Sequence, residues 1–351
     1  MRYRALGGTG LEVSEIGFGC GGTAGLMING SFEAQLAAVS RALELGINYF
    51  DEAPDYGDGV SETNLGKVLK ELGADPIVTT KVEVRNEDRG DIANHVERSV
   101  EASLRRLGRE YVDVVQIHNG PVEEPPQLEG RDYRVLSLHD YLRPDGALDG
   151  LRRLKASGKA RHIGFICRGD DGGPVRQLID TGEFSLVNIV HTLLNPTAAY
   201  PAEPGMEARP DFGQVIPYAH EKGVGVAVYS PLASGVLSDT ALAGEAPHPL
   251  SGLARRTGPV SDQRARQMAS AARFRVLSRQ GQTLAQAAFR FVLSHPGVTM
   301  VLGGFSDLSQ LEEVASTSDA GPLSPEDTSG VEAVWSAPRS TRERTRREAC
   351  S

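Results

Sequence analysis

The chain has 351 residues, of which 40% are apolar, so it can bury a large core as two ordinary domains or as one barrel. Its net charge of -9 argues against nucleic acid or an anionic membrane as the main partner, and no apolar run approaches the roughly 20 residues that span a bilayer. Its three cysteines, Cys20, Cys167 and Cys350, are far apart and the N-terminus lacks the apolar core of a signal peptide, so we expect a cytoplasmic protein without disulfides.

After a glycine-rich hairpin over residues 2–13, short apolar runs typical of buried strands alternate with longer runs of helical period. The predicted strands cover residues 15–20, 47–51, 76–84, 112–118, 161–167, 186–192, 224–230 and 299–303. The predicted helices cover residues 31–45, 61–72, 92–107, 148–156, 174–180, 212–222, 261–293 (two helices broken near Gly281) and 308–315. Eight strands, each followed by a helix, predict an α/β fold: a (β/α)8 TIM barrel with an N-terminal β-hairpin.

Three long segments interrupt this alternation, at residues 119–147, 195–211 and 232–260, and each follows a predicted strand. Long loops in compact domains are usually functional or disordered. In a barrel all three emerge at the C-terminal end, where barrel enzymes hold their active sites. We expect one domain over residues 1–335 and a disordered, Arg-rich tail over residues 336–351.

Ionisable side chains stand at the ends of three predicted strands. Asp51 ends the second strand with Tyr56 in the following loop, Lys81 lies in the third strand, and His118 ends the fourth. Each alone has a structural explanation as a salt-bridge or core residue, but strand ends converge in a barrel, so together they predict an active site. A phenol has a pKa near ~10 that a Lys ammonium lowers, so the group suits proton transfer to a carbonyl oxygen. In this scheme Asp51 holds Lys81, and His118 binds the substrate oxygen and helps to relay the proton.

Residues 17–22 (GFGCGG) spell G-x-G-x-x-G after a strand, as in dinucleotide-binding Rossmann domains. That fold requires a helix to open at once and an acid about 20 residues later, and the sequence has neither. The better interpretation is a loop whose backbone approaches a ligand closely, which makes Gly21 and Gly22 candidate cofactor contacts. The chain has no phosphate-loop motif, no HExxH motif and no His/Cys cluster, so we expect no metal.

Four segments together resemble the aldo-keto reductase superfamily: FDEAPDYGDGVSETNLGKVL, TTKV, VVQIHN and VAVYSPLASGVL. The resemblance runs from the hairpin to about Ala315. It implies a (β/α)8 barrel that moves a hydride between NAD(P)H and a carbonyl or alcohol. It also implies Tyr56 as the general acid, Lys81 and His118 as the partners that tune it, and Asp51 as the ion-pair partner of Lys81.

The resemblance further implies a nicotinamide cofactor that binds at the strand ends without a Rossmann domain. Tyr229 corresponds to the aromatic ring that stacks on nicotinamide. Ser230, Leu232 and Ser234 fall on the pyrophosphate side, and residues 304–313 fall on the adenosine side. The implied cofactor contacts are Gly21, Gly22, Asp51, Cys167, Asn188, Tyr229, Ser230, Leu232, Ser234, Gly304, Ser306, Gln310 and Glu313.

The chain departs from the superfamily pattern where the cofactor is held. The usual Ser-Asn pair for the carboxamide falls on Ile166 and Cys167, and the usual Gln falls on Asn188, so the carboxamide contact is either looser or rebuilt by Asn188, backbone or water. The segment GGFSDLSQLEE has no Arg or Lys for the 2′-phosphate of NADP, although a basic residue at 255–256 or 264–266 can replace it. We expect NADP, with NAD as the alternative.

The expected reaction is reduction of an aldehyde or ketone, or oxidation of an alcohol or sugar lactol. Tyr133, His139 and Tyr141 favour a sugar or polyketide over a small aliphatic aldehyde, and His191 is either a core or a pocket residue. Some superfamily members are regulatory subunits that bind nicotinamide nucleotides, so a redox-sensing protein with little turnover is the alternative. Isomerase or lyase chemistry is a third possibility, and no pattern indicates an oligomeric state.

Overall fold

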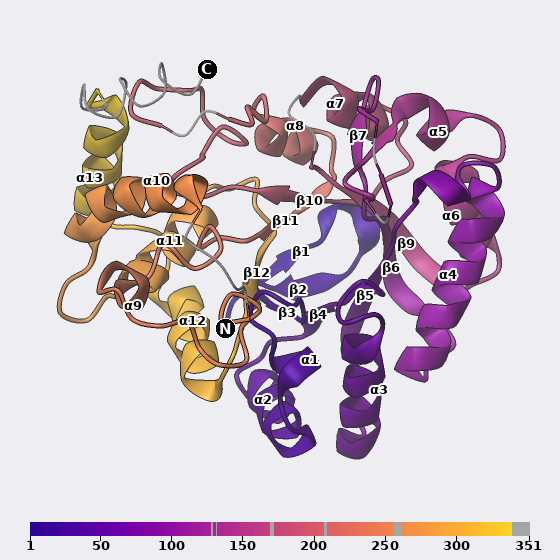
Figure 1. The fold of residues 1–351 in the computed structure, drawn as a ribbon, viewed down its shortest axis with the longest axis horizontal. Helices are drawn as coiled ribbons and strands as arrows, with labels where there is room; N and C mark the ends of the chain where they lie inside the picture. Colours follow the sequence, from indigo (N-terminus) through magenta and orange to yellow (C-terminus); the bar gives the residue numbers. More distant parts are fainter. Residues whose placement is uncertain (128, 131, 169–171, 207–208, 256–260, 339–351) are drawn as a thin grey trace.

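The computed structural model describes residues 1–127, 129–130, 132–168, 172–206, 209–255 and 261–338, which include a closed barrel of eight parallel strands (Figure 1). The strands follow chain order around the barrel, and the last pairs with the first. They are β3 (Ile16–Gly19), β4 (Tyr49–Asp51), β5 (Ile77–Val82), β6 (Val112–Ile117), β9 (Ala160–Ile166), β10 (Leu186–Val190), β11 (Gly225–Tyr229) and β12 (Met300–Gly304). The predicted (β/α)8 barrel is confirmed.

Helices surround this barrel. The helices that match the predicted ones are α2 (Phe32–Glu44), α3 (Val60–Leu72), α4 (Ile92–Leu107), α6 (Ala147–Ala156), α7 (Gly172–Asp180), α8 (Val215–Glu221), α10 (Asp262–Ala271), α11 (Leu284–Leu293) and α12 (Leu308–Ala320). Further helical segments are η1 (Gly7–Thr9), α1 (Leu26–Asn29), η2 (Asn86–Asp88), α5 (Leu138–Leu142), α9 (Asp239–Leu242), η3 (Ala272–Leu277) and α13 (Pro325–Ser336).

Local sequence signals set several helix boundaries. The Ser31 side chain accepts a hydrogen bond from the Ala34 backbone at the start of α2, and Gly108 ends α4 in the left-handed conformation. The predicted break near Gly281 is confirmed, because that residue has a φ of 84° between η3 and α11. The sequence did not predict α13, although Trp335 docks it by donating from Nε1 to the Leu193 carbonyl at 3.0 Å.

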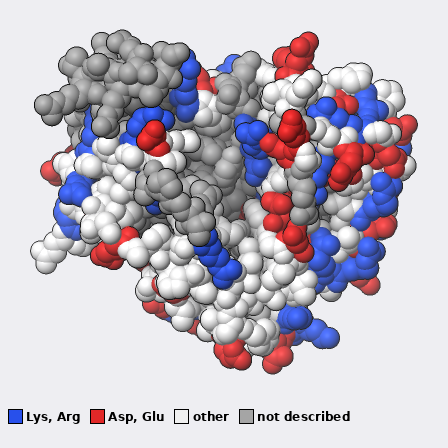
Figure 2. Space-filling model, viewed as in Figure 1, with Lys and Arg blue, Asp and Glu red and all other residues white. Residues whose placement is uncertain are grey.

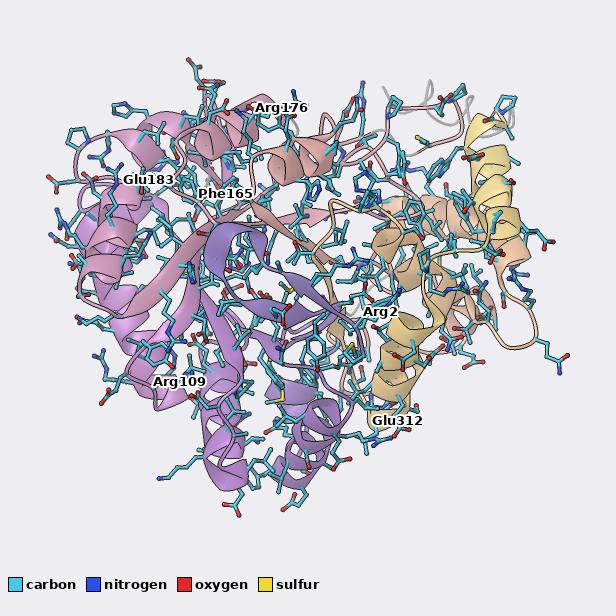
Figure 3. All side chains as sticks on the ribbon, turned by 180° about the vertical axis from the view of Figure 1, so that it is seen from behind. Arg2, Arg109, Phe165, Arg176, Glu183 and Glu312 are labelled. Carbon is cyan, nitrogen blue, oxygen red and sulfur yellow. The ribbon has the colours of Figure 1, made fainter. Side chains whose placement is uncertain are left out.

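The N-terminal hairpin closes one end of the barrel. β1 (Tyr3–Ala5) pairs antiparallel with β2 (Glu12–Ser14), and Figure 3 shows the hairpin across the end opposite to that seen in Figure 1. Leu6 and Val13 are fully buried in a cluster with Val114 and Met300 from the strands. Ligands therefore reach the barrel interior from the other, C-terminal end.

The long loops lie at that C-terminal end. The loop after β6 contains two short parallel strands, β7 (Gly120–Val122) and β8 (Val135–Ser137). The loop after β11 crosses to the loop after β3, where Gly252 N donates to Gly22 O at 3.1 Å and Ser251 Oγ donates to Thr23 O at 2.6 Å. Figure 2 shows this face from outside, with a hollow near its middle.

No helix among the described residues combines the length and apolar character needed to cross a bilayer. Nor do they contain a group of three His, Cys, Asp or Glu side chains placed to hold a metal. Residues 339–351, most of the predicted tail, lie outside the described residues, so the division into one domain and a tail stays a prediction.

Candidate active site

Three neighbouring strands bring the predicted ionisable residues together. Asp51 ends β4, Lys81 is the penultimate residue of β5, and His118 directly follows β6. Tyr56 comes from the tight turn after β4, where Gly57 has a φ of 67° that favours glycine. Because the C-terminal ends of parallel strands meet around the barrel axis, the four side chains surround one point.

The Lys81 ammonium is buried and fully bound. Nζ donates to Asp51 Oδ2 at 2.6 Å, to the Glu52 carbonyl at 2.7 Å and to Tyr56 OH at 3.0 Å. The side chains of Lys81 and Asp51 are 1% and 5% exposed. Three acceptors match the three N–H donors of an ammonium, so Lys81 is fixed against the phenol.

Tyr56 keeps its proton at neutral pH. Burial and the charge of Asp51 raise the pKa of its phenol well above 10, although the charge of Arg168 acts in the opposite direction. The sequence-based expectation of a lowered pKa is therefore wrong in direction, because desolvation disfavours the phenolate and Asp51 faces the same site. The protonated phenol is the form that acts as a general acid.

His118 is a neutral imidazole held on both sides. Its Nδ1 lies 2.9 Å from Glu83 Oε1, and its Nε2 lies 2.7 Å from Arg168 Nη2. Because a guanidinium only donates, Nε2 accepts and the ring proton lies on Nδ1. Burial, together with the charges of Arg168 and Lys81, lowers the pKa of His118 well below 6.5. Nε2 therefore has no proton for a substrate oxygen, and the expected relay through His118 requires Arg168 to move.

Arg168 is the site residue that sequence reasoning missed. It lies two positions after the end of β9, and its guanidinium lies 5.3 Å from the centre of the Tyr133 ring. Tyr133 OH in turn donates to Asp55 Oδ2 at 2.5 Å. The sequence signal was a charged residue immediately after the GFIC strand end.

Two cavities meet at Arg168. The smaller, about 280 Å³, is lined by Gly22, Thr23, Asp55, Tyr56, Gly57, His118, Tyr133, Arg168, Gly252 and Leu253. The larger, about 670 Å³, is lined by Arg134, Arg168, Val190, Thr192, Leu194, Asn195, Arg209, Pro210, Phe212, Tyr229, Ser230, Ala233, Ser234, Gln263, Arg266 and Gln267. The first has the size of a small-molecule site beside Tyr56, and the second leads away from it past Tyr229.

Glu52 makes stability depend on pH. It is fully buried, and burial, followed by the charge of Glu62, raises its pKa to about 8. Because this folded-state value lies above the ordinary 4.5, the protonated carboxyl stabilises the fold at low pH and that stability is lost as pH rises through about 8. In the wild type, the unfolding free energy should fall between pH 5 and 8 as Glu52 loses its proton. Glu52→Gln cannot titrate, so it should show a smaller fall over this range, measured by urea unfolding. The exposed Glu221→Gln should retain the wild-type fall, and equal slopes in E52Q and wild type would contradict the assignment.

A family model described as Aldo/keto reductase family matches residues 15–336. The chain belongs to the aldo/keto reductase family. An L-galactose dehydrogenase from Arabidopsis thaliana is 31% identical over 350 residues, which cover 95% of this chain and 94% of that protein. A solved aldo-keto reductase from Bacillus halodurans, in its holo form, has a TM-score of 0.69 and 24% identity, and it covers 97% of this chain and 99% of its own. That likeness supports the fold.

Two further relatives differ in their described roles. An NADH-specific methylglyoxal reductase from Escherichia coli (strain K12) is 29% identical over 260 residues, covering 68% of this chain and 70% of that protein. A probable voltage-gated potassium channel subunit beta from Arabidopsis thaliana is 26% identical over 340 residues, covering 92% of this chain and 93% of that protein. The family therefore includes oxidoreductases and proteins described as channel subunits.

Three residues stand where aldo-keto reductases hold the nicotinamide carboxamide. Two of them, Ile166 and Cys167, are apolar or weakly hydrogen-bonding, and the third, Asn188, already contacts neighbouring side chains. Ile166 ends β9, and burial raises the pKa of the Cys167 thiol to about 12. Asn188 Oδ1 accepts from Gln116 Nε2 at 2.8 Å, and its Nδ2 lies 3.5 Å from Asp51 Oδ1. Asn188 is thus engaged with neighbouring side chains, and rebuilding a carboxamide contact from it requires this pair to rearrange.

The remaining cofactor predictions divide into two groups. Tyr229, Ser230 and Ser234 line the larger cavity, and Gly22 lines the smaller one, while Gly21 lies against the Tyr56 ring. Leu232 packs against the core, and the adenosine-side residues of the described chain make internal contacts and line neither cavity. Ser306 Oγ donates to Ala24 O at 2.7 Å, Ser306 N donates to Gln310 Oε1 at 2.9 Å, and Thr283 Oγ1 donates to Glu313 Oε1 at 2.6 Å. Gly304 is the last residue of β12.

The residues expected to select the substrate also divide. Tyr133 lines the smaller cavity, whereas Tyr141 is buried with its OH donating to the Asn119 carbonyl at 2.5 Å, and His139 is exposed on α5. His191 is a core residue, because it is fully buried with its ring 5.0 Å from that of Phe291, and burial lowers its pKa to about 3.

Proposed function

We propose that the protein is an NAD(P)H-dependent oxidoreductase that reduces an aldehyde or ketone, or oxidises the corresponding alcohol or sugar lactol. The supporting observation is the buried ammonium of Lys81, 3.0 Å from the phenol oxygen of Tyr56 and 2.6 Å from Asp51, beside a cavity that His118 also lines. This arrangement holds a protonated phenol at the wall of a small-molecule cavity.

Each residue has a distinct task in the proposed reaction. The reduced nicotinamide, when bound, supplies the hydride to the carbonyl carbon. Tyr56 OH gives its proton to the carbonyl oxygen, and the resulting phenolate is stabilised by the charges of Lys81 and Arg168. Asp51 keeps Lys81 in place, and the segment at residues 250–252 covers the site through its contacts with Gly22 and Thr23.

The larger cavity suits an anionic dinucleotide. The described residues that line it include Arg134, Arg209 and Arg266, the hydroxyls of Ser230 and Ser234, and no Asp or Glu. Guanidinium groups and hydroxyls are the donors that phosphates recruit. We propose NADP as the cofactor, with Arg266 as a candidate for the 2′-phosphate. Of the other predicted substitutes, Arg256 lies outside the described residues.

Arg266→Gln is expected to weaken NADPH binding about tenfold and to leave NADH binding within about twofold, because only NADPH carries the 2′-phosphate. Fluorescence titration of each purified protein with NADPH and with NADH measures both constants. Arg98→Gln is the matched control, since Arg98 lies on α4 and pairs with Asp91 on the outer surface. Equal weakening of both nucleotides would assign Arg266 to a shared part of the cofactor, and tighter binding of NADH by the wild type would overturn the choice of NADP.

A redox-sensing protein with little turnover is the second candidate. Ile166 and Cys167 at the carboxamide positions and the relatedness to a probable channel subunit beta support it. Steady-state reduction of a panel of aldehydes, ketones and sugars separates the two functions. Turnover above about 1 s⁻¹ with any of them supports the enzyme, whereas tight cofactor binding with only trace turnover across the panel supports the sensor.

The proposed reaction belongs to a reducing compartment. Cys20 and Cys167 are both buried free thiols. Proteins of oxidising compartments more often use such residues in disulfides, so we propose a cytoplasmic location.

A further inference from the structure

The Arg168 guanidinium is a half-buried cation that no salt bridge within the described part of the chain neutralises. Among the described residues, no carboxylate forms an ion pair with it. Its charge interacts most with the phenols of Tyr229, Tyr133 and Tyr56, and also with the carboxylate of Asp132, which is paired with Arg134. Partly removing a cation from water is unfavourable unless an anion compensates, and carboxylates and phosphates are the anions whose oxygens match the guanidinium fork.

The charges that line the two cavities around Arg168 also favour an anionic ligand. The larger cavity is lined by four arginines and, in the described chain, by no acidic residue, although the protein has a net charge of -9. The one carboxylate on the wall of the smaller cavity, Asp55, already accepts from Tyr133 and lies 3.8 Å from Arg85. Among the described lining residues, Arg168 is the one arginine shared by both cavities, so its charge faces the smaller cavity beside Tyr56 as well as the larger one.

We infer that Arg168 binds a carboxylate bonded directly to the reacting carbonyl carbon, so that the preferred substrates are 2-oxo acids, including glyoxylate, in which the carbonyl is an aldehyde. The inference rests on the proposed reductase function. Arg168 Nη2 lies 2.7 Å from His118 Nε2, at the wall where Tyr56 also stands. A guanidinium this near the catalytic residues reaches a group one bond from the carbonyl and not one at the far end of a sugar chain.

The reaction balances with the proposed machinery. The carbonyl carbon of the 2-oxo acid gains the hydride, and its oxygen gains the proton of Tyr56. The products are a 2-hydroxy acid and the oxidised nicotinamide nucleotide, and the carboxylate keeps its charge throughout. The contact between Arg168 and the carboxylate therefore orients the substrate and takes no part in bond changes.

Binding of oxamate, compared with its neutral isostere oxamide, tests the inference without requiring turnover. Isothermal titration with and without NADPH should show oxamate binding about 10- to 100-fold more tightly to the wild type. Arg168→Gln should abolish this ratio, and Arg168→Lys, which keeps the charge but not the fork, should retain a part of it. Arg152→Gln is the control, since Arg152 lies on α6 and pairs with Asp149 and Glu183 at the surface.

Turnover separates this inference from the proposed function. The wild type should prefer glyoxylate over glycolaldehyde in kcat/KM by at least about tenfold, and R168Q should remove the preference while NADPH binding is unchanged. If oxamate binds as expected but neither aldehyde is reduced, the anion site stands and the reductase function is overturned. Equal affinity of oxamate and oxamide, or a loss of NADPH binding in R168Q in place of the oxamate effect, overturns the assignment of Arg168.

Discussion

Replacing Tyr56 by phenylalanine is expected to lower kcat about 100- to 10,000-fold while cofactor affinity changes little. The substitution removes the hydroxyl that lies 3.0 Å from Lys81 Nζ and keeps the ring that packs against Gly21. A positioned general acid contributes about this factor to the rate, and its loss acts on the transition state and not on ground-state binding. Single-turnover reduction with saturating NADPH measures the chemical step directly.

Tyr133→Phe is the matched control for this loss. Tyr133 lines the same cavity, but its hydroxyl donates to Asp55, and among the described residues it makes no hydrogen bond to Lys81. We expect its substitution to alter KM and to leave kcat within about tenfold. If Y133F matched Y56F in its loss, or if Y56F kept more than about a tenth of the wild-type kcat, another group would be the proton donor.

The meeting of Asp51, Lys81 and His118 at one site was predictable from the sequence because it depends on strand order. A strand that ends in Asp51, a strand that holds Lys81 and a strand followed by His118 are neighbours in the barrel, so their ends must meet. The direction of the Tyr56 pKa was not predictable, because it depends on how far the phenol is removed from water. That quantity is set by the covering loops, which the strand pattern does not describe.

Two other features depend on contacts between distant segments. Arg168 follows β9, and its guanidinium contacts His118 and Tyr133, which lie 50 and 35 positions earlier in the chain. The helix α13 has few buried residues, and Trp335 docks it through Leu193. In both cases the decisive partner comes from elsewhere in the fold, so neither local periodicity nor motif spacing indicates it.

Replacing Lys81 by methionine is expected to cost about 3–5 kcal/mol of unfolding free energy and to reduce kcat at least about 100-fold. Methionine has a similar length but no charge, so Asp51 loses its 2.6 Å partner while it remains 5% exposed. Removing one member of a buried ion pair leaves the other without compensation, and this accounts for the loss of stability. The loss of rate has a separate cause, because Tyr56 then lacks the ammonium that stabilises its phenolate. Urea unfolding and single-turnover kinetics on the same preparation measure the two effects.

The double variant Asp51→Asn/Lys81→Met separates these causes. It removes the uncompensated carboxylate, so most of the stability lost in K81M should return, as expected for a neutral pair that replaces a buried ion pair. The rate should stay low, because the ammonium is still absent beside the phenol. If D51N failed to restore stability, the cost of K81M would come from lost packing or from the unpaired carbonyl of Glu52, which also accepts from Lys81 at 2.7 Å. If the double variant recovered its rate, Lys81 would serve only to neutralise Asp51, and the phenolate would depend on Arg168 alone.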